Sequence, residues 1–333
     1  MRKRIGIPLI IIILALLFYT LKDINFLEVY SLLKQINPLY LILAILSYLC
    51  YFLIWNARWQ HTMKGFVNAR YFSLLRILFA GVFVNTITPG TGIGGEPVRA
   101  YYLKKKYKHP KTKFLGYILA DKTFNVIAFA IFIVFSLIFL SFFLKIPSIA
   151  KTISFTILAA LVIFTIILLL VWKNSRYEMR WLAEKFYKIK SIRKRFNNLP
   201  HLEKYLTRKT HNFTIVFKEV VTDKHKIYFG IILSIILRLF EYLAVYLIFL
   251  SLGVNMNFIS IIVVVTLSHL LGDLSPTPGG IGVVEGSMIL LYSAIGIPPA
   301  LAAVVALLTR VIYYFYTLLL GGLSLLWLKL ASK

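Results

Sequence analysis

Two copies of a Thr-Pro-Gly sequence, each followed by a glutamate, carry the residues of this chain that could do chemistry. The first copy runs from Thr88 to Glu96 and the second from Thr277 to Glu285, and each lies on an apolar segment. Proline and glycine break helices, and a break inside a bilayer leaves backbone polar groups that need protein or a water-filled cavity around them. Matching breaks in two halves of a chain are typical of a transporter's midplane site. The pattern therefore predicts one site built from both copies.

The residues around each break could bind an anionic group. Glycine lets backbone approach a ligand closely and present N–H groups to it, and Arg99 follows Glu96 on the same face of a helical segment. Close helix packing is the simpler explanation for any single glycine, but the repetition of the set favours a site. The predicted substrate-binding residues are Thr88, Pro89, Gly90, Gly92, Gly94, Gly95, Glu96, Arg99, Asp273, Thr277, Pro278, Gly279, Gly280, Gly282, Glu285 and Arg310.

Charged residues elsewhere in apolar runs should form supporting ion pairs or face a cavity, because a lone charge inside a membrane is costly. Asp121 and Lys122 stand near the start of one run, and Arg238 and Glu241 lie three apart in another. We predict that Asp121, Arg238 and Glu241 belong to such pairs. Lys122 can instead reach the membrane surface, because the long side chain of lysine can carry its charge to water.

Arg310 lies deep in the last apolar run without an acidic neighbour in sequence. It must therefore pair with a residue of another helix, for which Glu285 and Asp273 are the candidates, or meet an anionic group of a substrate. An arginine suits either role because its planar guanidinium can bind a carboxylate or a phosphate with two hydrogen bonds.

The composition is that of an integral membrane protein. Of the 333 residues, 59% are hydrophobic and 15% are charged, whereas soluble domains average about 25% charged residues. The net charge of +26 does not indicate nucleic-acid binding, because the basic residues lie in loops between apolar runs. Membrane topology and anionic headgroups explain that distribution. Cys50 is the single cysteine, which excludes a disulfide framework and a cysteine-rich metal site.

Apolar runs occur at 5–21, 39–55, 71–89, 114–143, 153–172, 227–252, 257–272, 280–295 and 299–328. About 20 helical residues cross a bilayer core. The basic start Arg2-Lys3-Arg4 precedes the first run, and no small-residue cleavage site follows it, so we predict a retained signal anchor rather than a cleaved signal peptide. Positive charge then places the start of the chain and the loop 56–70, which contains Arg58, in the cytoplasm.

The basic loops also predict that two apolar segments turn back inside the membrane. A full crossing by the third run would put the lysines of 104–113 and the basic segment 173–226 outside. A re-entrant hairpin over 71–103 avoids this, and a second over 258–295 enters from the opposite face. The predicted fold is all-α and polytopic, with about six full spans plus two re-entrant hairpins in an inverted repeat. Eight full spans are the alternative, and both termini are expected in the cytoplasm.

The segment 173–226 is the only long polar stretch in an otherwise single membrane domain of residues 1–333. It separates a first half, 1–172, from a second half, 227–333. Its apolar residues recur at helical spacing among many basic ones, which predicts a cytoplasmic amphipathic insert lying on the inner leaflet. A small solvated helical insert is the alternative, and the segment is too short to predict a catalytic domain.

Templates for catalysis fit the sequence poorly. His269 and Asp273 can share a helical face, but two candidate ligands do not make a metal site, and no His-Glu-x-x-His is present. The chain also lacks Gly-x-Ser-x-Gly and a Walker-type phosphate loop. We therefore predict no catalytic residue, no metal and no cofactor.

Residues 85–99 read Asn-Thr-Ile-Thr-Pro-Gly-Thr-Gly-Ile-Gly-Gly-Glu-Pro-Val-Arg, and 278–286 read Pro-Gly-Gly-Ile-Gly-Val-Val-Glu-Gly. In order and spacing they resemble the two signatures of the lysylphosphatidylglycerol synthase transmembrane-domain family, over nearly the whole chain. That resemblance implies a flippase-like membrane protein. Two-part members carry a C-terminal domain that aminoacylates phosphatidylglycerol, whereas this sequence reaches Lys333 directly after its last apolar run, so the resemblance implies a stand-alone member.

Three functional hypotheses follow. The first is a flippase-like protein of the plasma membrane that moves an anionic or zwitterionic lipid, a phospholipid or a polyprenyl-phosphate-linked precursor, between leaflets. The second is a membrane enzyme acting on polyprenyl diphosphate lipids, although the Ser/Arg-rich phosphate motif that such enzymes need after Pro-Gly is missing. The third is a non-transporting partner of a separately encoded lipid-modifying transferase. Membrane lipids are the expected partners, and nucleic acid is not.

Overall fold

The computed structural model describes residues 25–88, 94–143, 184–188, 190–193, 196 and 198–331. All regular elements within these ranges are helices. Four of the described helices are long and apolar enough to cross a membrane. They are α3 (Pro38–Thr62), α6 (Lys111–Phe143), α11 (Lys224–Ser251) and the continuous run of α14 (Pro299–Tyr314), a π-helical turn η2 (Phe315–Leu320) and α15 (Gly321–Leu330). The prediction of an all-α polytopic membrane fold is confirmed, and the predicted spans 5–21 and 153–172 lie outside the described residues.

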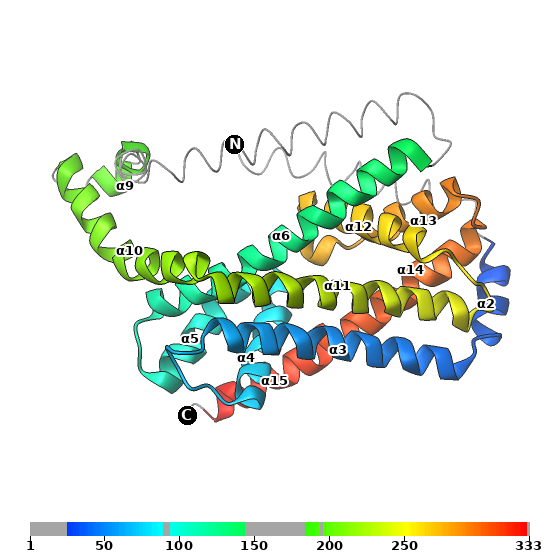
Figure 1. The fold of residues 1–333 in the computed structure, drawn as a ribbon, viewed down its shortest axis with the longest axis horizontal. Helices are drawn as coiled ribbons and strands as arrows, with labels where there is room; N and C mark the ends of the chain where they lie inside the picture. Colours follow the sequence, from blue (N-terminus) through cyan, green and yellow to red (C-terminus); the bar gives the residue numbers. More distant parts are fainter. Residues whose placement is uncertain are drawn as a thin grey trace.

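Two pairs of shorter helices form hairpins that reach into the bundle from opposite ends (Figure 1). The first consists of α4 (Tyr71–Ile87) and α5 (Gly95–Tyr107). The second consists of α12 (Phe258–Leu274) and α13 (Val283–Ala294), with a short turn η1 (Pro278–Gly280) at its tip. At 17 residues each, α4 and α12 are about 25 Å long, short of the roughly 30 Å of a hydrocarbon core. Both predicted hairpins are therefore present, and they insert in opposite directions.

The two ends of the bundle differ in charge. The first hairpin enters from the end where α3 and α15 finish, on the left in Figure 1, and the loops there carry many of the lysines. At the opposite end, beside the short helix α2 (Phe26–Lys34), the described loops 35–37, 252–257 and 295–298 contain no charged residue. The bundle thus has one basic end and one nearly uncharged end.

An Asn or Asp side chain caps the start of several described helices, including α3, α11 and α12. The side-chain oxygen of Asn37 accepts a hydrogen bond from the backbone N–H two residues later, at the start of α3. Asn257 does the same for α12, and Asp223 accepts from the N–H groups of His225 and Lys226 at the start of α11. Such caps satisfy N–H groups that a helix leaves unpaired at its first turn. Short polar connections therefore fix where these helices start.

Helix α3 is longer than its apolar run, and this corrects the sequence interpretation of Arg58. The helix continues to Thr62, and Arg58, expected in a cytoplasmic loop, is only 1% exposed. Its Nε and Nη2 donate to the two carboxylate oxygens of Asp121 on α6, both at 2.9 Å, and Nη1 donates to Ser234 Oγ on α11 at 2.6 Å. The charge is buried because a bidentate partner satisfies it, and the ion pair ties three long helices together.

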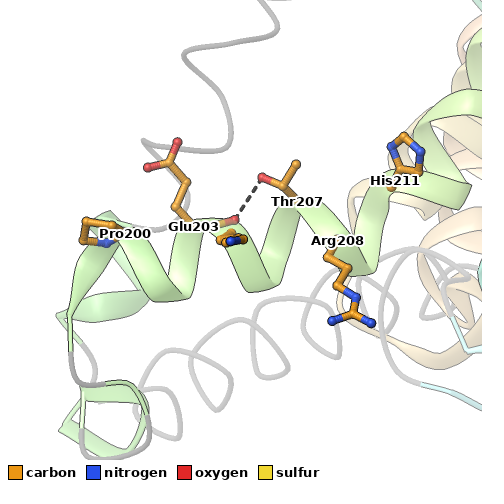
Figure 2. A pocket seen from close by; sticks show the side chains of 6 residues that line it. Pro200, Glu203, Thr207, Arg208 and His211 are labelled. Carbon is orange, nitrogen blue, oxygen red and sulfur yellow. Dashed lines mark hydrogen bonds between the residues drawn. The ribbon is translucent and has the colours of Figure 1, made fainter.

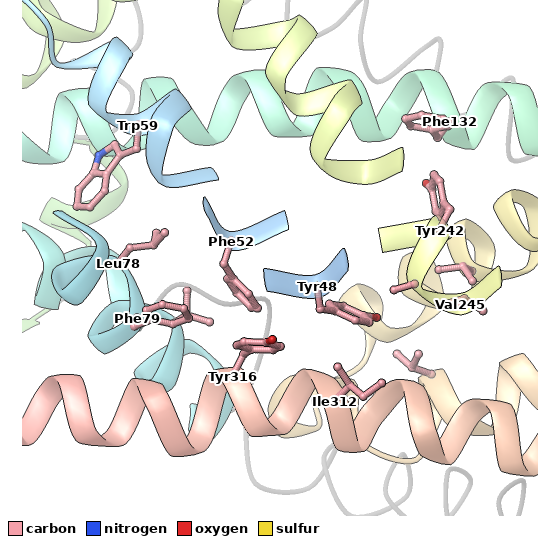
Figure 3. Packing of buried hydrophobic residues seen from close by; sticks show 14 of the residues in the cluster. Tyr48, Phe52, Trp59, Leu78, Phe79, Phe132, Tyr242, Val245, Ile312 and Tyr316 are labelled. Atoms are coloured by element: carbon pink, nitrogen blue, oxygen red, sulfur yellow. The ribbon is translucent and has the colours of Figure 1, made fainter. Parts of the chain in front are cut away.

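Helix α3 also supplies much of the aromatic core (Figure 3). The ring of Phe52 packs against Phe79 of α4 and Tyr316 of η2, with centroids 5.2 and 5.5 Å apart. Tyr48 and Trp59 are buried on the same helix. Each buried aromatic side chain removes about 150–250 Å² from solvent or lipid, so the first hairpin and the last span pack against a common rigid face.

The basic insert contributes one long described helix, α10 (Leu199–Thr222), and the short helix α9 (Lys190–Arg193). The C-terminal half of α10 packs against α6, where Val216 and Val220 are buried and Val216 lies beside Gly116. Among the described residues, the side chains that line one surface depression all belong to this helix (Figure 2). Groups on one helix do not converge on a ligand, so the depression is not a candidate site. Residues 173–183 lie outside the described ranges.

Candidate functional site

A cavity of about 480 Å³ lies where the C-terminal end of α4 meets the tip of the second hairpin. The two are close enough that a Cβ placed on Gly279 would lie 3.4 Å from the carbonyl oxygen of Thr86. Helices α3, α6, α11 and α14 close the other sides of the cavity. Pockets that bind small ligands usually measure about 300–1,000 Å³. The volume therefore suits a compact ligand or chemical group.

The walls of this cavity combine ionisable and aromatic side chains from several helices. The ionisable ones, other than tyrosine, are Lys122, Arg238, Glu241, His269, Asp273 and Arg310. The aromatic ones are Tyr48, Tyr51, Trp55, Phe129 and Tyr313. Charged groups inside an apolar bundle are expected to pair with one another or to face a polar cavity. Most of the charged residues named here line the cavity and also belong to an ion pair.

The tip of the second hairpin is held by Arg310. Its Nε lies 2.8 Å from Glu285 Oε1, and its Nη2 donates to the carbonyl oxygens of Gly279 at 3.1 Å and Gly280 at 3.4 Å. The other carboxylate oxygen, Glu285 Oε2, accepts from the N–H of Gly282 at 2.7 Å. These three glycines have positive φ angles, which a residue with a Cβ rarely adopts. Of the two partners expected for Arg310, the structure has Glu285.

The first hairpin has a corresponding arrangement. Lys122 Nζ on α6 donates to Glu96 Oε1 at 2.9 Å, and Arg99 Nη2 lies 3.6 Å from the same oxygen. The Arg99 guanidinium also lies near the rings of Trp55 and Trp59, 5.7 and 5.4 Å from their centroids. Contacts of this kind stabilise a cation through the negative face of the ring. Glu96 thus organises two cations just behind the break.

The two repeats share one plan. In each, the glutamate that follows the break is paired with a cation of the next long helix, Lys122 for Glu96 and Arg310 for Glu285. In each, the cation lines the cavity and the glutamate does not. The glutamates therefore stand behind the wall of the cavity and fix the positions of the cations that form it.

A third ion pair lines the cavity between the hairpins. Arg238 Nη1 donates to Glu241 Oε2 at 2.7 Å within α11, and the guanidinium lies 4.5 Å from the centre of the Phe129 ring. His269 Nδ1 on α12 lies 3.4 Å from the other carboxylate oxygen, Glu241 Oε1. One carboxylate therefore faces both an arginine and a histidine.

Two of the predicted glycines of the first hairpin serve packing. A Cβ on Gly95 would lie 2.0 Å from the carbonyl oxygen of Gly81, so α4 and α5 can approach only because that residue is a glycine. The N–H of Gly95 already donates to Asn85 Oδ1, at 2.5 Å. A Cβ on Gly94 would meet the side chain of Thr88 at 2.6 Å. The close approach of helices explains both glycines.

The structure brings some of the predicted residues to the cavity and leaves others behind it. Those that line it are Asp273, Gly279, Gly280 and Arg310, with the predicted supporting pair Arg238 and Glu241. Those that do not are Thr88, Gly94, Gly95, Glu96, Arg99, Thr277, Pro278, Gly282 and Glu285, and Asp121 is paired with Arg58. Pro89, Gly90 and Gly92 lie outside the described residues.

Several cavity residues were not predicted from the sequence. Tyr48, Tyr51 and Trp55 recur along one face of α3, and that helical spacing within an apolar run was the available signal. Lys122 was expected at the membrane surface, and its side chain is 37% exposed yet bonded to Glu96. His269 was considered in the sequence as a candidate metal ligand. Within the described ranges, no cluster of three or more His, Cys, Asp or Glu is arranged to hold a metal.

Comparison with known proteins identifies the family. The model of the lysylphosphatidylglycerol synthase TM region matches residues 7–321. The chain belongs to this family. Similar proteins include a UPF0104 membrane protein of Pyrococcus horikoshii, 30% identical with 86% of each chain covered. Another, from Methanocaldococcus jannaschii, is 28% identical with 95% of this chain and 92% of that protein covered. A third, from Archaeoglobus fulgidus, is 28% identical with 99% and 98% covered.

Proposed function

We propose that this protein moves the headgroup of an anionic or zwitterionic lipid between membrane leaflets through the cavity where α4 meets the second hairpin. The observation that carries the proposal is the meeting of two oppositely inserted, broken helices at a polar cavity inside an apolar bundle. Such an arrangement is typical of membrane transporters. A cavity of about 480 Å³ can hold a headgroup while the tails stay in the surrounding lipid.

The cavity wall offers groups for both ends of a zwitterionic headgroup. Lys122, Arg238 and Arg310 present cations that can meet a phosphate. Asp273 is exposed and makes no hydrogen bond or ion pair with another described residue, so its carboxylate can meet an amine. In this mechanism the glutamates behind the wall keep two of the cations in place while the headgroup passes.

The charge asymmetry of the bundle supports an orientation. Basic loops remain on the cytoplasmic side of membranes, so the proposed arrangement has the lysine-rich end of the bundle, with both chain termini, in the cytoplasm of a cell whose plasma membrane holds the protein. Anionic lipids of the inner leaflet would then meet the basic loops before entering the cavity. A separately encoded lipid-modifying transferase is the proposed partner on that side.

Reconstitution tests the proposal. The purified protein would be placed in liposomes containing labelled phosphatidylglycerol, phosphatidylethanolamine or polyprenyl phosphate in turn, and label in the outer leaflet would be quenched with time. Protein-dependent movement of at least one lipid is expected. Lys122→Met should slow the movement of that lipid, because a cavity cation is lost. Arg208→Met on α10 is the control, since that side chain lies away from the cavity.

Absence of movement for every lipid would overturn the proposal. Release of phosphate from a polyprenyl diphosphate by the same preparation would support an enzyme instead. Equal loss of movement in Lys122→Met and Arg208→Met would assign the effect to general destabilisation rather than to the cavity.

A further inference from the structure

His269 lines the cavity and is ionisable, but the proposed binding of a headgroup gives it no role. It lies on α12, its side chain is 20% exposed, and its Nδ1 faces Glu241 Oε1 across 3.4 Å. Histidine is the side chain whose charge ordinarily changes between pH 5 and 8. A histidine that faces both a carboxylate and a water-accessible cavity can therefore gain and lose a proton during a transport cycle.

The carboxylate beside His269 is shared. Glu241 Oε2 accepts from Arg238 Nη1 at 2.7 Å, while Oε1 faces the imidazole. With a neutral imidazole the Arg238–Glu241 pair has no net charge. With an imidazolium the same three side chains carry one net positive charge, and the carboxylate must divide its attraction between two cations.

Charged groups of both signs surround this trio. The other ionisable groups that line the cavity around it are Asp273 on α12, Lys122 on α6, Arg310 and Tyr313 on α14, and Tyr48 and Tyr51 on α3. The hydroxyl of Tyr242 on α11 shares a hydrogen bond with Thr266 of α12, and Glu285 on α13 is paired with Arg310. Lys122 and Arg310 are already paired with Glu96 and Glu285. Protonating either of those glutamates would break an ion pair, whereas protonating His269 would add one.

We propose that His269 binds the proton that couples lipid movement to a transmembrane proton gradient, an inference that rests on the proposed translocation. A proton from cavity water joins the free imidazole nitrogen, and the imidazolium pairs with Glu241. Arg238 is then partly released, and the charge of the cavity becomes more positive by one, which strengthens the binding of an anionic headgroup. When the cavity opens to the less acidic side, the proton returns to water and the headgroup leaves with it.

Proton and headgroup binding are then reciprocal. If a bound proton strengthens headgroup binding, a bound headgroup must strengthen proton binding by the same factor. One proton moved with each lipid lets a gradient of one pH unit support an accumulation ratio of about tenfold across the bilayer. Lipid should therefore accumulate in the leaflet that faces the less acidic solution.

The test uses the full chain in liposomes that contain a trace of labelled phosphatidylglycerol and a pH difference of one unit. The wild type should reach a leaflet ratio close to the tenfold limit. His269→Gln keeps a hydrogen-bonding side chain near Glu241 but cannot take up a proton, so it should exchange lipid towards equal leaflets whatever the gradient. His201→Gln is the matched control, because it removes a histidine from the exposed face of α10, and it should behave like the wild type.

The outcomes separate the two proposals. If His269→Gln, with unchanged thermal stability, accumulates lipid as the wild type does, the proton site is overturned and translocation stands. If the wild type moves lipid without responding to the gradient, the proton site is likewise overturned. If the wild type moves no lipid, translocation fails. The proton site is then tested separately, by measuring proton uptake when phosphatidylglycerol is added to unbuffered protein in detergent. Equal uptake by wild type and His269→Gln would then overturn the proton site.

Discussion

Arg310 and Glu285 form an ion pair, with 2.8 Å between Nε and Oε1, that joins the last span to the start of α13. The same carboxylate accepts from the N–H of Gly282, and the same guanidinium donates to the carbonyl oxygen of Gly279. The pair therefore satisfies backbone groups that the break in the second hairpin leaves without helical partners. In a membrane such groups cost several kcal/mol each when unsatisfied.

The first prediction concerns the stability of this hairpin. Glu285→Gln keeps an oxygen that can accept from Gly282 but removes the negative charge opposite Arg310. Breaking a fully buried pair costs about 3–5 kcal/mol, and because the Glu285 side chain is 22% exposed we expect a smaller loss, about 1–3 kcal/mol. Thermal unfolding in detergent measures it. An unchanged midpoint would show that the pair does not stabilise the tip.

The second prediction concerns Asp273, whose carboxylate should matter for lipid movement and not for stability. Asp273 lines the cavity, is exposed, and has no hydrogen bond or ion pair among the described residues. Asp273→Asn should therefore change the free energy of unfolding by no more than about 0.5 kcal/mol. Movement of phosphatidylethanolamine, which carries an amine, should slow, whereas movement of phosphatidylglycerol should not. Equal slowing of both lipids would contradict amine binding at Asp273.

The buried pair of Arg58 and Asp121 gives a third prediction. Arg58→Met leaves the Asp121 carboxylate buried without its bidentate partner, and we expect a loss of about 3–5 kcal/mol. The double variant Arg58→Met with Asp121→Leu removes both charges and should be more stable than the single variant, because no unpaired charge remains. Both are compared by unfolding in detergent. A double variant less stable than Arg58→Met would argue against this account.

The sequence predicts the hairpins because their signals are local. A Thr-Pro-Gly break needs only the residues themselves, and the basic loops limit the number of crossings. A lone charge inside a membrane is costly, so Arg310 was expected to pair with another residue, and the sequence offered two candidate carboxylates. These inferences use properties of single residues and hold without knowledge of the packing.

The rest of the site depends on packing that single residues do not specify. The sequence does not reveal whether Lys122 extends to the membrane surface or to Glu96, because its long side chain reaches either. The sequence interpretation placed Arg58 in a loop because a charge at the end of an apolar run usually marks the end of a helix. Here a distant carboxylate, Asp121, makes burial favourable. The aromatic residues of the cavity are known only once α3 is placed between the hairpins.

Glycine packing in the first hairpin yields the fourth prediction. Gly95→Ala would place a methyl group 2.0 Å from the carbonyl oxygen of Gly81, so α4 and α5 must move apart, and overpacking of this kind typically costs about 1–3 kcal/mol. Gly322→Ala is the matched control in α15, because its added methyl would lie 3.5 Å from the ring of Phe83, an ordinary contact. We expect Gly95→Ala to lower the unfolding midpoint and Gly322→Ala to leave it unchanged or slightly higher. Equal effects would mean that the close approach at Gly95 is not limiting.

The last prediction concerns orientation in the membrane. Lys104 lies on α5 at the basic end of the bundle, and Asn255 lies in the uncharged loop at the opposite end, and both are exposed. In a Cys50→Ala background, a membrane-impermeant thiol reagent should label Asn255→Cys in intact cells, because its loop faces outward. It should label Lys104→Cys only after the cells are permeabilised, since basic loops stay in the cytoplasm. Labelling of Lys104→Cys from outside would reverse the orientation, and labelling of both residues from the same side would contradict the opposite insertion of the two hairpins.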